Sequence, residues 1–511
     1  MDNQSILYIL STSELTIIFL GLSIAVGLLL HANLLWPFRK ILSALISGLI
    51  GVSTGLLIVS GFNLLIIILI ALTQSFRLFS FLRVVKDRVN PLALNMRSFR
   101  TELVLCGFIL IFTFVQLTFV ENISSFYLLL GLAITQFISV LFFLYCVRKS
   151  AKTTLISLLK THIPDVELPS ITVAIPARNE TAALTDCLQS ILQNDYPKME
   201  IVVLDDCSQD STSDIIKSFA HQGVRFLEGT IPKGSWLSKN HAYDQLFQES
   251  EGKLILFCGV DVRFEKDSIR KLVEIYVKEN QKMISVLPTR NGLAGLNNII
   301  QPMRYWRELA IPKVFSKHPA CLGTCWLIER KYLGNIGSFL AFKQNIKPEK
   351  HFAKRAKTSK QYRFYVSSSG LGISSIKNYR NQWLTSLRTR YPEHKKQPEN
   401  VFIFTIWFAV VFASPFAVTV ISLFSGYVFP AILGLFSTIL LLYVHFKVNF
   451  MTNGKTDFFK VILFPLTVVS EIVLINYSMW AYEFSEVIWK GRNICLPVLK
   501  LVPKLPNIDK T

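Results

Sequence analysis

Three acidic residues follow apolar runs of the chain, in positions from which carboxylates can bind a nucleotide. Asp205 and Asp206 end the run that begins at Val202, and Asp261 follows the run Leu254-Ile-Leu-Phe-Cys-Gly-Val. A helical pattern separates the runs, which is typical of βαβ units in a parallel sheet. Ligands of such sheets bind outside the carboxyl ends of the strands. These residues therefore predict a nucleotide site, although each Asp taken singly could simply cap the helix that follows it.

The turn after the first apolar run narrows the choice of nucleotide. It reads Ile175-Pro-Ala-Arg-Asn-Glu180 and contains no glycine. A dinucleotide pyrophosphate is usually held by a Gly-x-Gly-x-x-Gly turn, because its glycines let the backbone approach the phosphates. Together with the three carboxylates, this turn points away from NAD and towards a nucleotide-sugar.

The elements that must position these residues form one α/β pattern. Apolar runs predict strands at 171–177, 200–205, 224–228, 253–259 and 283–288. Periodic runs between them predict helices at 181–193, 211–221, 236–249 and 267–279. The alternation indicates one mixed α/β domain with a core of its own.

Composition places part of the chain in a membrane. Of its 511 residues, 51% are hydrophobic, and the mean hydropathy of +0.42 exceeds that of ordinary soluble domains. The net charge of +20 would suit nucleic acid, but no basic recognition helix is evident, so we expect it to face anionic lipid head groups. The eight cysteines are scattered along the chain, and Cys321 and Cys325 have no second closely spaced cysteine pair beside them, which disfavours a zinc site and favours reduced thiols.

Long apolar runs predict membrane-spanning helices on both sides of the α/β domain, since about 20 residues cross the hydrocarbon core. They lie at 14–36, 41–59, 61–80, 101–120, 124–147, 401–424 and 427–446. Lys and Arg concentrate in alternate loops, so the positive-inside rule places the amino terminus outside and the α/β domain in the cytoplasm. The run 461–484 contains Pro465 and Glu471, which favour a broken, re-entrant or interfacial helix.

About residues 168–392 resemble the family 2 glycosyltransferases, which have the GT-A fold. The resemblance rests on the order and spacing of Ile175-Pro-Ala-Arg-Asn-Glu180, Asp205-Asp-Cys-Ser-Gln-Asp-Ser-Thr212 and the Asp261 segment. The loop at 231–242 is similar to the Gly-Trp-x-Gly-Lys-x-x-Ala loop of lipid-directed members, and 323–339 is similar to the acceptor-side segment. Trp489-Lys-Gly-Arg492 resembles the tail motif of carotenoid- and hopanoid-associated members.

This resemblance implies a role for each matching residue. The nucleotide-sugar would be bound by Pro176, Ala177, Arg178, Glu180, Asp205, Asp206, Lys239 and Asp261. Asp205 and Asp206 are suited to the base and ribose, and Lys239 to the sugar or diphosphate. Asp261 is suited to a divalent cation, Mg²⁺ or Mn²⁺, that neutralises the departing diphosphate.

Two positions depart from the family pattern. Gly259-Val-Asp261 stands where the family has Asp-x-Asp, so the first carboxylate is missing. Pro348-Glu349 stands where the family has a Glu-Asp pair, so the resemblance makes Glu349 the catalytic base. The alternative for Glu349 is a solvated surface charge in a Lys-rich segment.

The function predicted is a membrane-bound, inverting, non-processive transfer of a sugar from a UDP-linked donor to a lipid-like acceptor. The Gln-x-x-Arg-Trp motif of processive synthases is absent near Gln382, which disfavours a polysaccharide synthase. Arg388 and Arg390 could clamp a diphosphate or face lipid phosphates. A catalytically weakened accessory membrane protein is the other alternative. The expected partners are a nucleotide-sugar donor, a lipid acceptor and the membrane, with no nucleic acid.

We expect five regions in the chain. They are four transmembrane helices within 1–120, a fifth at 121–150, a cytoplasmic GT-A domain with interfacial helices at 165–395, transmembrane or re-entrant helices at 400–485, and a basic tail at 486–511. The first four helices could hold an acceptor lipid or a partner, or serve as a plain anchor. The whole is predicted to be a multi-pass protein of the inner membrane.

Overall fold

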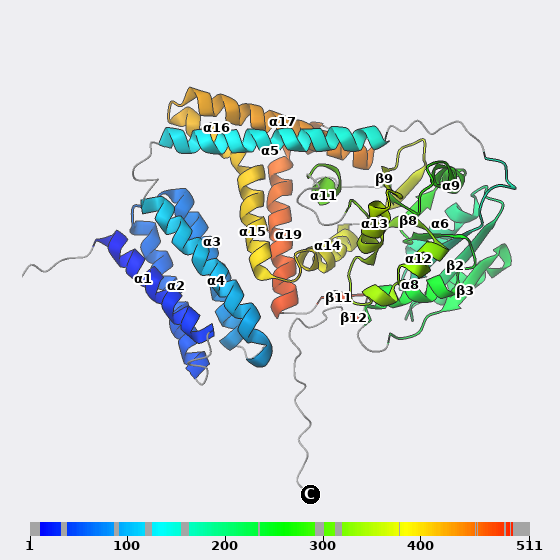
Figure 1. Cartoon of the computed structure of the whole chain (residues 1–511), viewed down its shortest axis with the longest axis horizontal. Helices are drawn as coiled ribbons and strands as arrows, with labels where there is room; N and C mark the ends of the chain where they lie inside the picture. Colours follow the sequence, from blue (N-terminus) through cyan, green and yellow to red (C-terminus); the bar gives the residue numbers. More distant parts are fainter. Residues whose placement is uncertain are drawn as a thin grey trace, which may run out of the picture.

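The computed structural model divides into an α/β domain and a set of long apolar helices that flank it in the sequence (Figure 1). The residues it describes are 11–31, 38–85, 91–117, 125–154, 163–232, 236–291, 301–311, 319–377, 379–454, 456, 458–484, 487–490 and 492–493.

A mixed seven-stranded sheet organises the α/β domain, with the strand order β3-β2-β1-β4-β8-β6-β9. Strands β3, β2, β1 and β4 are parallel, β8 is antiparallel to both β4 and β6, and β9 is parallel to β6. The strands are β1 (Ile171–Ala177), β2 (Met199–Asp205), β3 (Val224–Glu228), β4 (Leu254–Cys258), β6 (Met283–Leu287), β8 (Cys325–Glu329) and β9 (Tyr362–Val366). A second sheet joins β5 (Val262–Phe264), β10 (Ile373–Ile376) and β7 (Thr289–Asn291).

Helices cover both faces of the large sheet and link it to the apolar helices. Those of the α/β domain are α6 (Thr181–Leu192), α7 (Thr212–Ser218), η3 (Ala220–Gln222), α8 (Ser238–Glu249), α9 (Ser268–Lys278), α12 (Arg330–Asn335), η6 (Leu340–Phe342) and α13 (Pro348–Thr358). The linking elements are η4 (Gln301–Tyr305), α11 (Trp306–Leu309) and α14 (Tyr379–Glu393).

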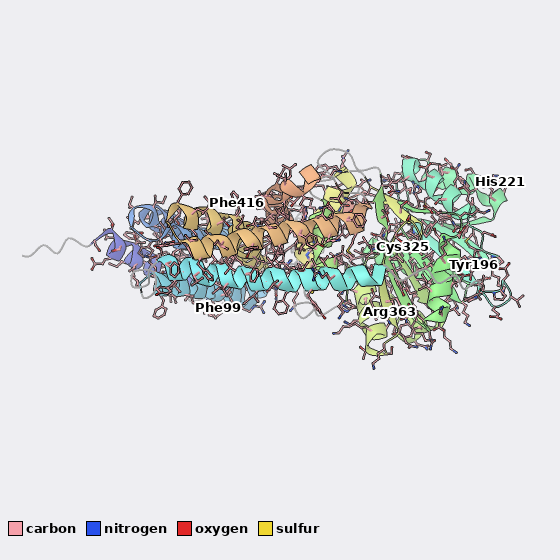
Figure 2. All side chains as sticks on the ribbon, turned by 90° about the horizontal axis from the view of Figure 1, so that it is seen from above. Phe99, Tyr196, His221, Cys325, Arg363 and Phe416 are labelled. Carbon is pink, nitrogen blue, oxygen red and sulfur yellow. The ribbon has the colours of Figure 1, made fainter. Side chains whose placement is uncertain are left out.

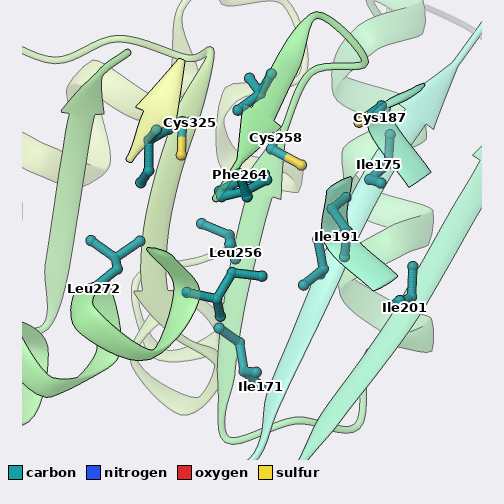
Figure 3. Packing of buried hydrophobic residues seen from close by; sticks show 14 of the residues in the cluster. Ile171, Ile175, Cys187, Ile191, Ile201, Leu256, Cys258, Phe264, Leu272 and Cys325 are labelled. Carbon is teal, nitrogen blue, oxygen red and sulfur yellow. The ribbon is translucent and has the colours of Figure 1, made fainter. Parts of the chain in front are cut away.

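The core explains why the central strands read as continuous apolar runs. Every residue of β4 is buried, because helices pack on both faces of the sheet. On one face, shown in Figure 3, Ile171 and Leu256 of the strands pack with Ile191 of α6 and Leu272 of α9. Burying one such side chain stabilises the fold by about 1.5–3 kcal/mol. This core holds the carboxyl ends of β1, β2 and β4 in fixed positions.

The five predicted strands and four predicted helices of this region are confirmed, with bounds shifted by a few residues. Strands β5, β7, β9 and β10 have no counterpart among the predicted runs. Strands β5, β7 and β10 are only three or four residues long, which carries too little periodicity to be recognised, and the edge strand β9 is interrupted by the exposed Arg363. All seven cysteines that the structure describes are free thiols, and those described residues contain no group of three His, Cys, Asp or Glu side chains that could hold a metal ion.

Long helices match the apolar runs on both sides of the α/β domain. They are α1 (Thr12–His31), α2 (Arg39–Val59), α3 (Leu64–Val85), α4 (Pro91–Val115), α5 (Ser125–Thr154), α15 (Pro398–Phe408), the π-helical turn η7 (Ala409–Ala413), α16 (Ser414–Phe424), α17 (Val428–Asn453), α18 (Phe458–Ile462) and α19 (Phe464–Phe484). By length and composition, six segments among the described residues could cross a membrane. They are Thr12–Leu30, Lys40–Val59, Ser125–Ala151, Pro398–Phe424, Val428–Asn453 and Phe464–Glu483.

Two of the predicted spans do not meet this criterion. The helix α3 contains only a shorter apolar stretch, Ile66–Phe79, and α4 is outside the set. Both carry a charged residue that is fully buried. Arg77 of α3 and Glu102 of α4 form an ion pair of 2.7 Å with both side chains 0% exposed. Charged groups in apolar helices are tolerated when they face the inside of a helical bundle and pair with one another.

The apolar helices run in different directions (Figure 1). Helices α5 and α17 lie side by side and extend to the α/β domain, which Figure 2 shows from above. Helices α15 and α19 form a second pair that lies across them, and α1–α4 form a bundle beyond this pair. The bundle is docked through Phe76 and Phe108, whose ring centroids lie 5.1 and 5.2 Å from that of Phe402. Glu399 of α15 pairs with Arg100 of α4 at 2.6 Å.

The run 461–484 is broken at Leu463, between the end of α18 and the start of α19, and α19 is then continuous from Phe464 to Phe484. Pro465 is the second residue of the helix, where its missing N–H is not needed for a hydrogen bond. Glu471 is compensated by Arg390, at 2.5 Å. Helix α19 lies across α5 and α17 in Figure 1, and its segment Phe464–Glu483 is long and apolar enough to cross a membrane.

Interfacial helices are expected within 165–395, and two elements there, η4 and α11, pack between the α/β domain and the apolar helices. Met303, Tyr305 and Trp306 of η4 and α11 are buried. The Trp306 indole N–H donates a hydrogen bond of 3.2 Å to Nδ1 of His445 on α17, and its ring lies edge-on to Phe143 of α5. The α/β domain is therefore fixed directly to the two long helices.

Candidate active site

A single pocket lies at the carboxyl ends of β1, β2 and β4, as the sequence predicts for a ligand site. It brings together eight of the nine predicted site residues, namely Pro176, Ala177, Arg178, Glu180, Asp206, Lys239, Asp261 and Glu349. The ninth, Asp205, is not among the lining residues. Five further basic side chains line the same pocket, namely Arg304, Lys347, Lys377, Arg388 and Lys490.

The two neighbouring aspartates at the end of β2 have different surroundings. Asp205 accepts hydrogen bonds from the backbone N–H of Ser208 at 3.1 Å and from the hydroxyls of Ser208 and Ser213. Its carboxylate therefore holds the turn between β2 and α7, and a contact of Asp205 with the nucleotide stays a prediction. Asp206, only 4% exposed, lines the pocket and is fixed by a 2.8 Å hydrogen bond from its N–H to the Ala177 carbonyl.

The turn after β1 is held by its own arginine. The Arg178 guanidinium donates to the carbonyl oxygens of Asp206 and Cys207, the second at 2.8 Å, and to that of Lys490 at 3.0 Å. Asn179 has a positive φ of 49°, a conformation that Asn tolerates better than most residues. Arg178 thus joins the ends of β1 and β2 into one wall of the pocket.

Asp261 lies at the centre of a charged group. Its Oδ2 accepts a hydrogen bond of 3.0 Å from the Ser375 hydroxyl and lies 3.9 Å from both Lys377 Nζ and Arg290 Nη1. Burial acts to raise the pKa of Asp261, but Lys377, Arg290 and Ser375 outweigh it and hold this pKa below its usual value. Asp261 is therefore ionised at neutral pH. Burial also lowers the pKa of Lys377 to about 8, against the opposing effect of Asp261.

The geometry explains the missing first carboxylate of the Asp-x-Asp pattern. A Cβ atom on Gly259 would lie 2.7 Å from Asp261 Oδ1, so the Asp261 carboxylate occupies the space that a side chain at 259 needs. An aspartate at 259 would force the Asp261 side chain to move. In this arrangement only one carboxylate is available at the strand end.

The residues at the pocket fit a hard divalent cation that takes part of its ligands from the substrate. Mg²⁺ is commonly bound through one or two carboxylates, with substrate phosphates and water completing the shell. Of the carboxylates that line the described part of the pocket, Asp261 follows the end of β4, where a diphosphate could add its oxygens. The described residues contain no group of three His, Cys, Asp or Glu side chains that could hold a cation without the substrate.

Lys239 and Glu349 meet over the backbone of Gly323. A Cβ atom at that glycine would lie 2.7 Å from Glu349 Oε1 and 3.2 Å from Lys239 Nζ, so both side chains require a glycine there. Lys239, near the start of α8, also lies 5.1 Å from the ring centroid of Tyr243. Burial lowers the pKa of Lys239, and the Glu349 carboxylate opposes that shift.

Glu349 is buried in the first turn of α13, with 2% of its surface exposed. Its Oε2 has no hydrogen-bond partner among the residues that the structure describes. An unpaired carboxylate oxygen is costly to bury, and such groups gather at functional sites. The alternative of a solvated surface charge is therefore wrong for Glu349.

Arg388 and Arg390 both belong to α14 but have different surroundings. Arg388 lines the pocket, whereas Arg390 is not among the lining residues and pairs with Glu471 and Glu393. Sequence reasoning missed Lys377 and Arg304, because neither stands in a recognisable motif. Lys490 could have been found, because it lies within the tail motif. Residues 233–235 of the loop at 231–242 lie outside the described residues, as does most of the tail at 486–511.

Part of the α/β domain is similar to known proteins. Residues 172–337 match the model of the family described as glycosyl transferase family 2. Over 150 residues the chain is 32% identical to a 4,4'-diaponeurosporenoate glycosyltransferase of Staphylococcus aureus strain N315. That alignment covers 28% of this chain and 39% of the relative, so the chain spans about two fifths of the length of the curated relatives it matches.

Two solved structures are similar at low identity. The mannosyltransferase PcManGT from Pyrobaculum calidifontis, in complex with GDP-Man and Mn²⁺, is 18% identical with a TM-score of 0.42, covering 68% of this chain and 99% of that one. S. aureus TarS 1-349 in complex with UDP-GlcNAc is 14% identical with a TM-score of 0.31, covering 63% and 95%. The domain that carries the pocket is thus a family 2 glycosyl transferase domain of the GT-A fold, and it resembles the corresponding region of carotenoid-related glycosyltransferases.

Proposed function

We propose that this protein is a membrane-bound, inverting, non-processive glycosyltransferase that moves a sugar from a nucleotide-sugar, UDP-linked, to a lipid-like acceptor. The observation that carries the proposal is the convergence of Asp206, Asp261, Lys239 and Glu349 on one pocket, although they come from four separate segments of the chain. Pro176, Ala177, Arg178 and Glu180 would complete the donor site on the β1 side.

The reaction would be a single displacement. Glu349 takes the proton from the acceptor hydroxyl, whose oxygen forms a bond to the anomeric carbon of the donor sugar. The bond from that carbon to the phosphate oxygen breaks, and the nucleoside diphosphate leaves with the electron pair. Asp261 would hold Mg²⁺ or Mn²⁺, which when bound would supply positive charge for the departing diphosphate. Lys239 and Arg388 line the pocket and add charge of the same sign.

A lipid-like acceptor is supported by the surroundings of the pocket. Its lining includes the apolar side chains of Ile346, Ile376 and Leu384. Leu384 belongs to α14, which packs along α19. The similar relatives from S. aureus are named 4,4'-diaponeurosporenoate glycosyltransferases. Six apolar segments beside the domain support a multi-pass membrane protein, and we propose that the catalytic domain faces the cytoplasm.

The acceptor and sugar are best identified by mass spectrometry of lipids from cells with and without this protein. We expect a glycolipid or a glycosylated pigment that is present only when the protein is made. Cells that carry the Glu349→Gln variant serve as the matched control and should lack the product. An unchanged lipid profile, together with no sugar release from any nucleotide-sugar, would favour the accessory role instead.

The place of the cation is tested by Asp261→Asn. We expect Mg²⁺ or Mn²⁺ to strengthen binding of the donor nucleotide to the unaltered protein, and this gain to fall about tenfold or more in the variant, because the amide lacks the ligand charge. Calorimetry with and without a chelator measures it. Asp267→Asn is the control, since Asp267 is exposed at the start of α9, lies outside the pocket lining and pairs with Lys271 at 3.3 Å. Equal metal dependence in Asp261→Asn and the unaltered protein would reject Asp261 as a ligand.

A further inference from the structure

A lysine lies beside the carboxylate that is suited to the divalent cation. Lys377 follows strand β10 and lines the pocket together with Asp261. Its Nζ lies 3.9 Å from Asp261 Oδ2, which is beyond the range of a hydrogen bond but within that of an ion pair. The two side chains are 21% and 20% exposed. An ammonium and a cation would therefore occupy neighbouring positions at one carboxylate.

Arg290, the second positive charge near Asp261, has different surroundings. Its side chain is 5% exposed, and it is not among the lining residues of the pocket. Its guanidinium donates hydrogen bonds of 3.0 Å to the hydroxyls of Tyr305 and Ser375. These bonds fix Arg290 outside the pocket, where it supports the Asp261 carboxylate. Lys377 is the one of these two cations that a ligand in the pocket can reach.

The charges at Asp261 oppose tight binding of a divalent cation. Ser375, Lys377 and Arg290 already stabilise its carboxylate. A cation at Asp261 would bring two further positive charges within a few ångströms of the Lys377 ammonium, and like charges at such distances repel one another. A second carboxylate at position 259 would offset this repulsion, but Gly259 supplies none. The Lys377 ammonium and the cation therefore oppose one another at this strand end.

We propose that Lys377 is a donor-binding residue that competes with the divalent cation for Asp261. Without the cation, the ammonium neutralises Asp261 and contacts the diphosphate of the donor, and a bound cation displaces it from both. The inference rests on the proposed function and concerns how this pocket supplies positive charge to the diphosphate. Lysine suits the role because its ammonium is a compact charge on a flexible four-carbon stem. The pocket thereby keeps a charge for the diphosphate when the cation is absent.

The test compares UDP binding with and without a cation on the full-length protein in detergent. Calorimetry measures the affinity for UDP in a chelator and in saturating Mn²⁺. In Lys377→Gln we expect the affinity in chelator to fall about tenfold to a hundredfold, because a charge-assisted contact is lost. The affinity in Mn²⁺ should change by less than about threefold, because the cation has then displaced Lys377 in the unaltered protein as well. The gain in affinity from Mn²⁺ should therefore be larger in the variant.

Three controls accompany this variant. Lys377→Arg should keep most of the affinity for UDP in chelator, because the guanidinium keeps the positive charge. Lys271→Gln is the matched control, since Lys271 also pairs with a carboxylate, that of Asp267 at 3.3 Å, but lies outside the pocket lining. It should match the unaltered protein under both conditions. Uridine, which has no diphosphate, should bind equally to the unaltered protein and to Lys377→Gln.

Each other outcome has a distinct meaning. Equal losses of UDP affinity with and without Mn²⁺ in Lys377→Gln would make Lys377 a residue that only shapes the pocket, and would overturn the inference. Unchanged affinity in chelator would overturn it as well, while the proposed function would stand. If Lys377→Gln does not fold, the unaltered protein decides, because UDP that binds no more tightly than uridine in chelator contradicts the role of Lys377. Absence of UDP binding even in Mn²⁺ would overturn the proposed donor, and the inference with it.

Discussion

Replacing Glu349 by Gln is expected to lower kcat by about 10²–10⁴-fold, which is the usual contribution of a general base. The amide has nearly the same shape and fits the same space beside Gly323, so the pocket should keep its geometry. Affinity for the nucleotide-sugar should therefore change little. Single-turnover transfer measures the first quantity and calorimetry the second.

The control for this variant is Glu329→Gln. Glu329 ends β8, away from the pocket lining, and pairs with Lys282 at 2.5 Å. It should transfer sugar at the rate of the unaltered protein. Full activity of Glu349→Gln would move the base to another residue, whereas loss of donor binding in that variant would point to a role for Glu349 in holding Lys239.

Replacing Glu393 by Gln is expected to lower the free energy of unfolding by about 3–5 kcal/mol, because removing one partner of a buried ion cluster leaves the others uncompensated. Glu393 of α14 is 7% exposed and pairs with four cations. These are Lys347, Lys350 at 3.7 Å, Arg307 at 3.1 Å and Arg390 at 3.6 Å. Loss of its charge would loosen α13, whose first turn carries Glu349, from α14.

The control is Glu249→Gln, whose side chain is 51% exposed and pairs with Arg225 at 3.1 Å. An exposed pair contributes about 0–1 kcal/mol, so this variant should unfold at nearly the same denaturant concentration as the unaltered protein. Denaturant midpoints in detergent, followed by tryptophan fluorescence, measure both. Equal midpoints for the two variants would contradict the role assigned to the Glu393 cluster.

The same cluster predicts a pH dependence. Burial acts to raise the pKa of Glu393, but Lys347, Lys350, Arg307 and Arg390 outweigh it and hold this pKa well below its usual value. A carboxylate with a lowered pKa in the folded state stabilises the protein above its unfolded pKa of about 4.3, and this contribution is lost as the pH falls towards the folded pKa. The stability difference between the unaltered protein and Glu393→Gln should therefore be constant near pH 7 and shrink below about pH 4.

The sequence by itself determined the parallel half of the sheet and the direction in which the site faces. Strands β1 and β4 are buried on both faces, so their apolar runs are visible without any knowledge of their neighbours. The acidic residues that follow them had to lie at one edge, because parallel strands end on the same side. The long apolar helices could also be predicted, because an unbroken run of about 20 apolar residues is a local property of the sequence.

Only the tertiary structure decided which of these residues line the pocket. Asp205 and Asp206 are adjacent and identical, yet the serines at 208 and 213 take one carboxylate and leave the other to the pocket. The burial of Glu349 depends on a glycine that is distant in the chain, and the place of Lys490 depends on the path of the chain after α19. Such contacts join segments far apart in sequence, and local hydrophobic periodicity carries no record of them because it reports burial without naming the neighbour.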